Sequence, residues 1–271
     1  NVVQWSAGYG TADGGDDSVT VRTVFRLGEL SEPVVALALH RLSNARAWNV
    51  ESPVSTWAHA QTIPSGLQET SAADILSHTG PDGADFPLLQ HLVEMAEGHD
   101  LEVLVRAMVL DPHHLTSMTF VPLASGGMAR GHDRSGQPLP ASPVDGDDIS
   151  GSLFSSASDY ARFLMEASTL GRRDPATWHR LVRPHGPIAE EHHLARGLGW
   201  IVARAKDGSP LAFRVGTTPG YTSFALVDET RKRALVVFTN GDGGVDLTEE
   251  VLRFLDPWSA PVVKAYLHPQ E

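Results

Sequence analysis

The sequence contains no cysteine in its 271 residues. This absence excludes a disulfide bond, a thiolate metal site and a cysteine nucleophile. It leaves the redox compartment undecided, because cysteine usage is the feature that would indicate one. Any nucleophile or metal ligand must therefore come from another residue type.

Long apolar runs and an excess of positive charge are also missing. No run of apolar residues is long enough to span a bilayer, and Asn1–Trp5 does not resemble a signal peptide. We therefore favour a cytoplasmic location, although a leader could have been removed. The formal net charge of −12 argues against nucleic acid and anionic membrane surfaces as partners. The acidic residues are scattered along the chain, which is typical of a solvated surface.

The remaining composition is that of an ordinary globular protein. Hydrophobic residues make up 41% of the chain and charged residues 20%. The length allows one large domain or two small ones. The sequence shows no internal repeat.

One stretch, Phe25–Leu39, organises the rest of the chain. Its second half predicts a helix whose apolar side chains run almost all the way round the cylinder, so we expect the helix to be buried. Pro33 suits the first turn, where its missing N–H has no partner to lose. Ser31 or Glu29 is the expected N-cap residue.

Two acids stand three positions apart at the start of this predicted helix. Glu29 and Glu32 therefore face one side of the entrance to a buried element. Like charges at close range cannot both ionise cheaply, so we expect one of the two carboxyl groups to have a raised pKa. A protonated and an ionised carboxyl group together can act as a general acid and a general base.

The same stretch resembles a known active-site segment. Phe25-Arg26-Leu27-Gly28 followed by a buried helix is similar to the segment of class C-type serine β-lactamases and of related penicillin-binding proteins, D-aminopeptidases and esterases. In that family the segment carries Ser-x-x-Lys, in which the serine is the nucleophile and the lysine helps to activate it. Here Glu29 takes the serine position and Glu32 the lysine position. The resemblance thus implies a scaffold without its acyl-transfer nucleophile.

Ser31 is a poor replacement for the missing serine. It lies two positions after Glu29, which turns it about 200° round a helix. The family's second motif, Tyr-x-Asn, is missing as well, because its two positions fall on Pro81 and Gly83.

Further segments resemble the family in its own order along the chain. They lie at 50–57, 70–80, 88–98, 111–120, 149–164, 197–200, 213–223 and 235–240. The resemblance implies an α/β (α+β) fold of the β-lactamase/transpeptidase type, with an antiparallel sheet flanked by helices and a mostly helical region. Residues 1–42 and 166–271 are expected to form the sheet-containing region. The family's usual first helix and strand are not seen ahead of it, either because they are truly absent or because they precede the given sequence. Residues 43–165 form the helical region, with a long loop at 126–150, and residues 235–240 are expected to form a buried strand.

The resemblance also implies where the other site residues lie. Arg214 takes the place of the family's Lys or His on the strand that faces the nucleophile, and Gly216 and Thr217 follow it. These three residues and His78, which the family uses as a structural histidine near the site, are the predicted binding residues. Arg214 could bind an anionic substrate or pair with a carboxylate.

Three functions remain open at this point. The first is general acid/base chemistry on a small molecule by Glu29 and Glu32: dehydration, isomerisation, cyclisation or hydrolysis by activated water. The second is a non-catalytic protein that binds a ligand or a protein partner, with Glu32 paired to Arg214. The third is a residual ester or amide hydrolase. We predict no cofactor and no metal, since no third ligand accompanies the two glutamates. The oligomeric state is not predicted.

Overall fold

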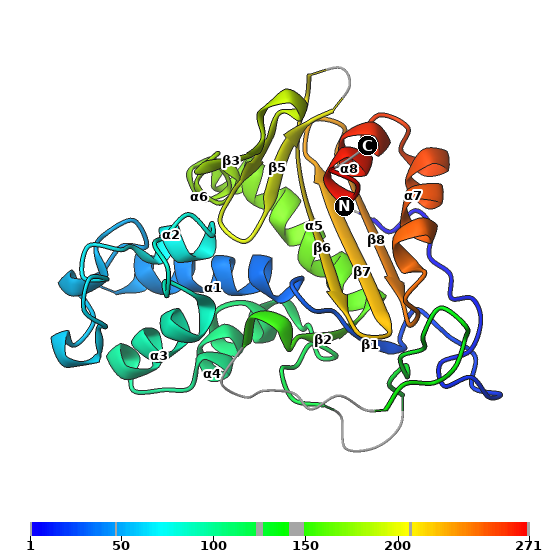
Figure 1. Ribbon diagram of the computed structural model, residues 1–271, viewed down its shortest axis with the longest axis horizontal. Coiled ribbons are helices and arrows are strands. Elements are labelled where there is room, and N and C mark those ends of the chain that lie inside the picture. The colour runs from blue at the N-terminus through cyan, green and yellow to red at the C-terminus, as the bar shows by residue number, and fades with distance from the viewer. Residues whose placement is uncertain (1, 47, 123–126, 141–148, 206–207, 270–271) are drawn as a thin grey trace.

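The computed structural model describes residues 2–46, 48–122, 127–140, 149–205 and 208–269. Figure 1 shows an antiparallel sheet that is packed between helices, and a helical part beside it. The six strands of this sheet, in their spatial order, are β3 (Gly186–Ala189), β4 (Leu194–Arg196), β5 (Ile201–Arg204), β6 (Pro210–Thr218), β7 (Tyr221–Asp228) and β8 (Arg233–Thr239). Every neighbouring pair is antiparallel.

Helices cover both faces of the sheet because the long strands carry apolar residues on both faces. One face packs against α5 (Ala157–Arg173), and the other packs against α7 (Gly244–Leu255) and α8 (Ala260–Leu267). The edge-to-face contact between Phe213 and Tyr266 joins β6 to α8. The predicted α/β fold class is therefore confirmed.

The helical part surrounds α1 (Ser31–Ala45), of which 12 residues are buried. Its other helices are α2 (Ala72–Leu76), α3 (Phe86–Glu97), α4 (Leu101–Val105), the π-helical turn η3 (Arg106–Leu110) and the 3₁₀ turns η1 (Val54–Thr56), η2 (Ala60–Thr62), η4 (Asp111–His113) and η5 (Ile149–Gly151). A two-stranded ribbon of β1 (Val24–Arg26) and β2 (Phe154–Ser156) runs into α1 and α5. The remaining elements are α6 (Pro175–Val182) and the 3₁₀ turn η6 (Glu190–His192).

The start of α1 differs from the prediction in one detail. Leu30 is the N-cap residue, and no side chain caps the helix. The Ser31 hydroxyl instead donates to the carbonyl oxygen of Gly28, one turn back. Glu29 thus lies outside the helix proper, whereas Glu32 lies inside its first turn, and this difference sets their surroundings apart.

Two other predictions concern the strand at 235–240 and the loop at 126–150. The predicted strand at 235–240 is present as β8, but its residues are half-buried, because β8 is an edge strand of the sheet. Of the predicted loop at 126–150, residues 126 and 141–148 lie outside the described residues. In the described part of the chain, no helix has the length and apolar character needed to cross a membrane.

Candidate functional site

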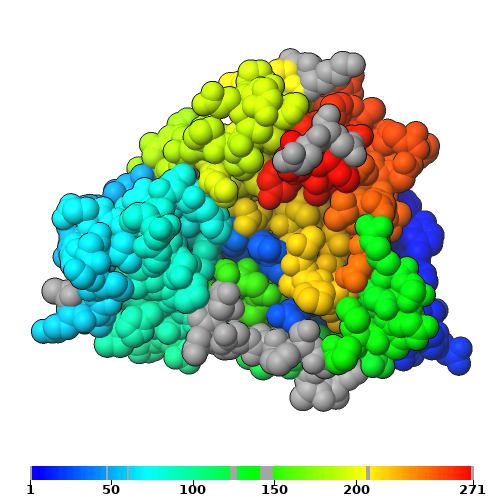
Figure 2. All heavy atoms as spheres, in the orientation of Figure 1, coloured from blue at the N-terminus to red at the C-terminus, as the bar shows by residue number. Residues whose placement is uncertain are grey.

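The first turn of α1 meets the sheet at the end of β6. Figure 2 shows a hollow between the cyan helical part and the yellow strands, with blue atoms of the early chain at its floor. The close approach depends on two glycines. A Cβ on Gly216 would lie 2.0 Å from the carbonyl oxygen of Leu27, and Gly28 has a φ of +55°, which favours glycine. The Ser223 hydroxyl fastens the contact by donating to Leu27 O at 2.6 Å.

Glu32 lies at the bottom of this site, where its side chain is only 2% exposed. Arg214 Nη2 donates to Glu32 Oε1 at 2.5 Å, and the Arg214 side chain is itself only 10% exposed. His78 Nε2 contacts the other oxygen, Oε2, at 3.0 Å. Both carboxylate oxygens therefore have a partner, which a buried charge requires.

His78 reaches Glu32 from the end of α2. The His78 N–H donates to Ile75 O, and the Thr79 N–H donates to Asp74 O. These two bonds form a Schellman motif, which places His78 at the position that usually holds a left-handed glycine. His78 has a φ of +51° accordingly. Its side chain is 39% exposed, so the imidazole links the buried carboxylate to solvent.

Glu29 lies at the opening of the site and is half-buried. Its Oε2 accepts a hydrogen bond of 2.9 Å from the backbone N–H of Thr217 at the end of β6. The pairing of β5 with β6 ends at Phe213, so Thr217 lies beyond the part of β6 that β5 covers. The Glu29 carboxylate thus bridges the start of α1 and the end of β6.

The structure brings all six predicted site residues to the first turn of α1, five of them in two groups. Glu32, Arg214 and His78 form the buried group, and Glu29 and Thr217 form the open group. Gly216 is buried between β6 and Leu27. Each carboxylate has its own hydrogen-bond donors, and no hydrogen bond between the two is present in the described part of the chain. The acid/base pairing of Glu29 with Glu32 stays a prediction, and so does the role of each residue.

Tyr160 is a site residue that sequence reasoning missed. It projects from α5, is fully buried, and donates its hydroxyl to Leu30 O at 2.9 Å. Burial raises its pKa well above 10.0, and the nearby Glu32 charge raises it further, while Arg214 opposes the shift. Tyr160 therefore supports the start of α1 as a neutral hydrogen-bond donor. Its place in the 149–164 segment gave no signal of this contact, because 130 residues separate it from Leu30.

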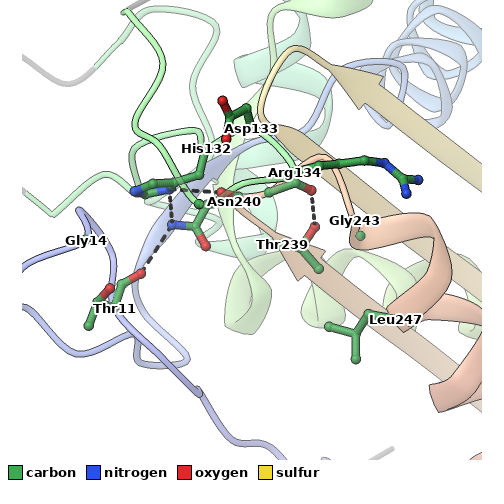
Figure 3. Close-up of a pocket in the computed structure, with 12 residues that line it drawn as sticks. Thr11, Gly14, His132, Asp133, Arg134, Thr239, Asn240, Gly243 and Leu247 are labelled. Atoms are coloured by element: carbon green, nitrogen blue, oxygen red, sulfur yellow. Dashed lines mark hydrogen bonds between the residues drawn. The ribbon is translucent and has the colours of Figure 1, made fainter.

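A second hollow, of about 450 Å³, lies beyond Thr239 at the C-terminal end of β8. Figure 3 shows Asn240 at its centre, close to His132 and Thr11. The Asn240 amide donates to the carbonyl oxygens of Thr11, Ala12 and Arg130. These bonds tie the N-terminal segment to β8, which is a structural role. None of the predicted site residues lines this hollow.

Metal ligands do not gather at either place. Within residues 2–46, 48–122, 127–140, 149–205 and 208–269, no group of three or more His, Asp or Glu side chains is arranged to hold a metal ion. The site offers the carboxylate of Glu29 and the imidazole of His78 to a ligand, and these two groups can transfer protons and form hydrogen bonds.

Solved structures place this arrangement in a known class of fold. The chain is similar to an octameric penicillin-binding protein homologue from Pyrococcus abyssi, with a TM-score of 0.76, 18% identity, and coverage of 89% of this chain and 68% of that one. It is also similar to a β-lactamase/D-alanine carboxypeptidase from Pseudomonas syringae, with a TM-score of 0.75, 14% identity, and coverage of 92% and 90%. A class C β-lactamase from Rhodobacter sphaeroides gives a TM-score of 0.68, 17% identity, and 84% coverage of both chains. The fold is that of the β-lactamases and penicillin-binding proteins.

The family follows from the sequence itself. The β-lactamase family profile matches residues 82–255, and the chain belongs to that family. The matched range includes Arg214 and Thr217 but begins after Glu29, Glu32 and His78. No curated protein matches the sequence.

Proposed function

We propose that this chain is a β-lactamase-family protein that forms no acyl-serine and instead transfers a proton on a small molecule bound beside the first turn of α1. The observation that carries the proposal is the position of Glu29. The resemblance of residues 25–39 to the family's active-site segment gives Glu29 the position of the nucleophile. Its carboxylate is half-buried and, among the described residues, accepts one hydrogen bond, from the Thr217 N–H. A carboxylate held in this way retains lone pairs for a ligand or a water molecule.

The reaction class is general acid/base chemistry: dehydration, isomerisation, cyclisation or hydrolysis by activated water. Glu29 is the group that meets the ligand in this proposal. Glu32 does not touch the bound molecule in this proposal, because its side chain is only 2% exposed and both of its carboxylate oxygens have protein partners. Arg214, which the sequence suggested as an anion-binding residue, is occupied by Glu32 and serves the ligand only through it.

A simple probe tests the base. 5-Nitrobenzisoxazole opens when a base removes its one reactive C–H proton, as the N–O bond breaks and a phenolate forms. We expect the wild-type chain to accelerate this opening and Glu29→Gln to lower the rate by about 100-fold, the usual contribution of a positioned base. The matched control is Glu69→Gln, which removes an exposed carboxylate outside the site. Equal rates in wild type and Glu29→Gln would reject the proposal.

A second candidate is a non-catalytic protein that binds a ligand or a partner. The Arg214–Glu32 ion pair favours it, since a buried, paired carboxylate can persist for structural reasons alone. Failure of the wild type to accelerate any proton-transfer probe, together with ligand binding that survives Glu29→Gln, would support this candidate. Labelling by a fluorescent penicillin would instead support a residual hydrolase, and we expect none.

A further inference from the structure

We propose that His78 is the acid that complements Glu29, and that Glu32 is a positioning residue that holds its imidazole. This inference rests on the proposed function and deepens it. It names the residue that donates a proton to the leaving group. The proposed function concerns only the base, Glu29, which removes a proton from the ligand. It also moves the second proton-transfer role from Glu32 to a residue that solvent can reach.

The backbone at His78 is the first observation. The residue occupies the left-handed position of a Schellman motif, with a φ of +51°, where glycine fits without a steric cost. Residues other than glycine are uncommon in this conformation, although histidine is enriched in it together with asparagine and aspartate, and His114 and His193 also adopt it. The turn therefore fixes where the imidazole projects, and the contact with Glu32 and the exposure of the ring indicate its role.

The contact with Glu32 is the second observation. Glu32 Oε2 lies 3.0 Å from Nε2, and an ionised carboxylate only accepts hydrogen bonds, so Nε2 carries a proton in this contact. In the neutral ring Nδ1 is then the nitrogen without a proton, and it is the atom that can gain and release one. Arg214 balances the charge of Glu32 at 2.5 Å, which lets the carboxylate remain buried.

The surroundings of the ring fix its direction. Phe86 at the start of α3 packs with a ring-centroid distance of 5.8 Å. Glu32 from α1 contacts the imidazole, Arg214 from β6 pairs with the other oxygen of Glu32, and Asp74 lies on α2, the helix that ends just before His78. Asp74 is engaged by the N–H and hydroxyl of Ser71. Glu32 is thus the one carboxylate among these that bonds to the ring.

The step that follows balances as a dehydration. Glu29 takes a C–H proton from the ligand, a C=C bond forms between that carbon and its neighbour, and the C–O bond on the neighbouring carbon breaks. The leaving hydroxide takes the proton from Nδ1 of the imidazolium and departs as water. His78 then regains a proton from solvent, and Glu29 returns its proton to solvent.

Two probes separate the acid from the base. The opening of 5-nitrobenzisoxazole needs a base alone, whereas the dehydration of 4-hydroxy-4-phenylbutan-2-one also needs an acid for its hydroxide. We expect Glu29→Gln to slow both reactions. We expect His78→Asn to slow the dehydration about 100-fold more than it slows the opening of 5-nitrobenzisoxazole. Asparagine tolerates the left-handed backbone, so this variant keeps the turn and loses the imidazole, while Arg214 still pairs with Glu32.

A purely structural histidine predicts a different pattern. His78→Asn would then match the wild type in both reactions while Glu29→Gln still slowed them, which would overturn this inference and leave the proposed function standing. Loss of activity in His78→Asn with no effect of Glu29→Gln would reject the proposed function instead.

A measurement independent of turnover completes the test. We expect ¹⁵N NMR of the histidine side chains to show Nε2 of His78 protonated throughout and Nδ1 gaining its proton on acidification. In Glu32→Gln the amide can either donate or accept, and the preference for the Nε2–H form should weaken. A neutral ring with its proton on Nδ1 in the wild type would overturn the inference, whatever the probes show.

Discussion

The buried and the open side of the first turn of α1 carry the same residue type in very different surroundings. Glu32 is 2% exposed and joined to Arg214 and His78, whereas Glu29 is half-buried and joined to the backbone of Thr217. The difference arises because Glu32 lies within the helix and faces β6, while Glu29 precedes the N-cap. The two glutamates thus differ in their surroundings: Glu32 is a buried, paired charge, and Glu29 is the charge that meets the ligand in the proposed function.

The largest expected effect on stability comes from removing the carboxylate on the buried side of the turn. Glu32→Ala leaves the Arg214 guanidinium buried without its partner, so we expect the free energy of unfolding to fall by about 3–5 kcal/mol. Urea unfolding followed by circular dichroism measures this loss. A loss below about 1 kcal/mol would mean that the ion pair contributes no more than an exposed one.

Removing both charges should cost less than removing one. In Glu32→Leu/Arg214→Met two apolar side chains replace the pair, and neither leaves an uncompensated charge behind. We expect the double variant to be more stable than either single variant, with a coupling of about 1–3 kcal/mol in a double-mutant cycle. Additive losses from the two single substitutions would show that the two side chains act separately.

Tyr160, which supports the first turn of α1, should have an intermediate effect on the free energy of unfolding. Tyr160→Phe removes the donor to Leu30 O and leaves a buried carbonyl without it, which costs about 1–3 kcal/mol. The same residue predicts alkaline sensitivity. Its folded-state pKa is raised above 10.0, so unfolding releases a proton at high pH, and its stabilising contribution is present below pH 10 and lost above it.

Urea midpoints between pH 8 and 11 check this second part. The wild type should lose stability above pH 10 more steeply than Tyr160→Phe, because the variant has no phenol to ionise at this position. Parallel curves for the two proteins would show that Tyr160 does not contribute to the alkaline transition.

The smallest effect on stability is expected on the open side. Glu29→Gln keeps an oxygen that can accept from the Thr217 N–H, and the side chain is partly solvated, so we expect a change of at most about 1 kcal/mol. Thermal and urea unfolding of the variant beside the wild type measure it. A loss as large as that of Glu32→Ala would erase the distinction between the two sides.

Much of this arrangement can be predicted from the sequence, because it depends on local residue patterns. The buried helix, the acids at its start and the order of the family-like segments led to the right fold. The Arg214–Glu32 contact was among the alternatives considered. The capping prediction failed because Leu30 ends the preceding turn, and Ser31 bonds back to Gly28 instead.

The rest depends on contacts between distant parts of the chain. His78 and Glu32 are 46 positions apart, and Tyr160 and Leu30 are 130 apart, so no periodicity could pair them. The prediction that residues 235–240 form a buried strand was wrong for a related reason. An apolar run is typical of a strand with neighbours on both sides, but β8 ends the sheet and is only half-buried.

A paired measurement on Glu29→Gln and Glu32→Gln tests the central claim most directly. Urea unfolding and the opening of 5-nitrobenzisoxazole are followed on the same preparations. The predicted result is a normal free energy of unfolding with a lost rate for Glu29→Gln, and a reduced free energy of unfolding for Glu32→Gln. Equal losses of stability in the two variants, or a full rate in Glu29→Gln, would contradict the division between a structural and a ligand-facing acid.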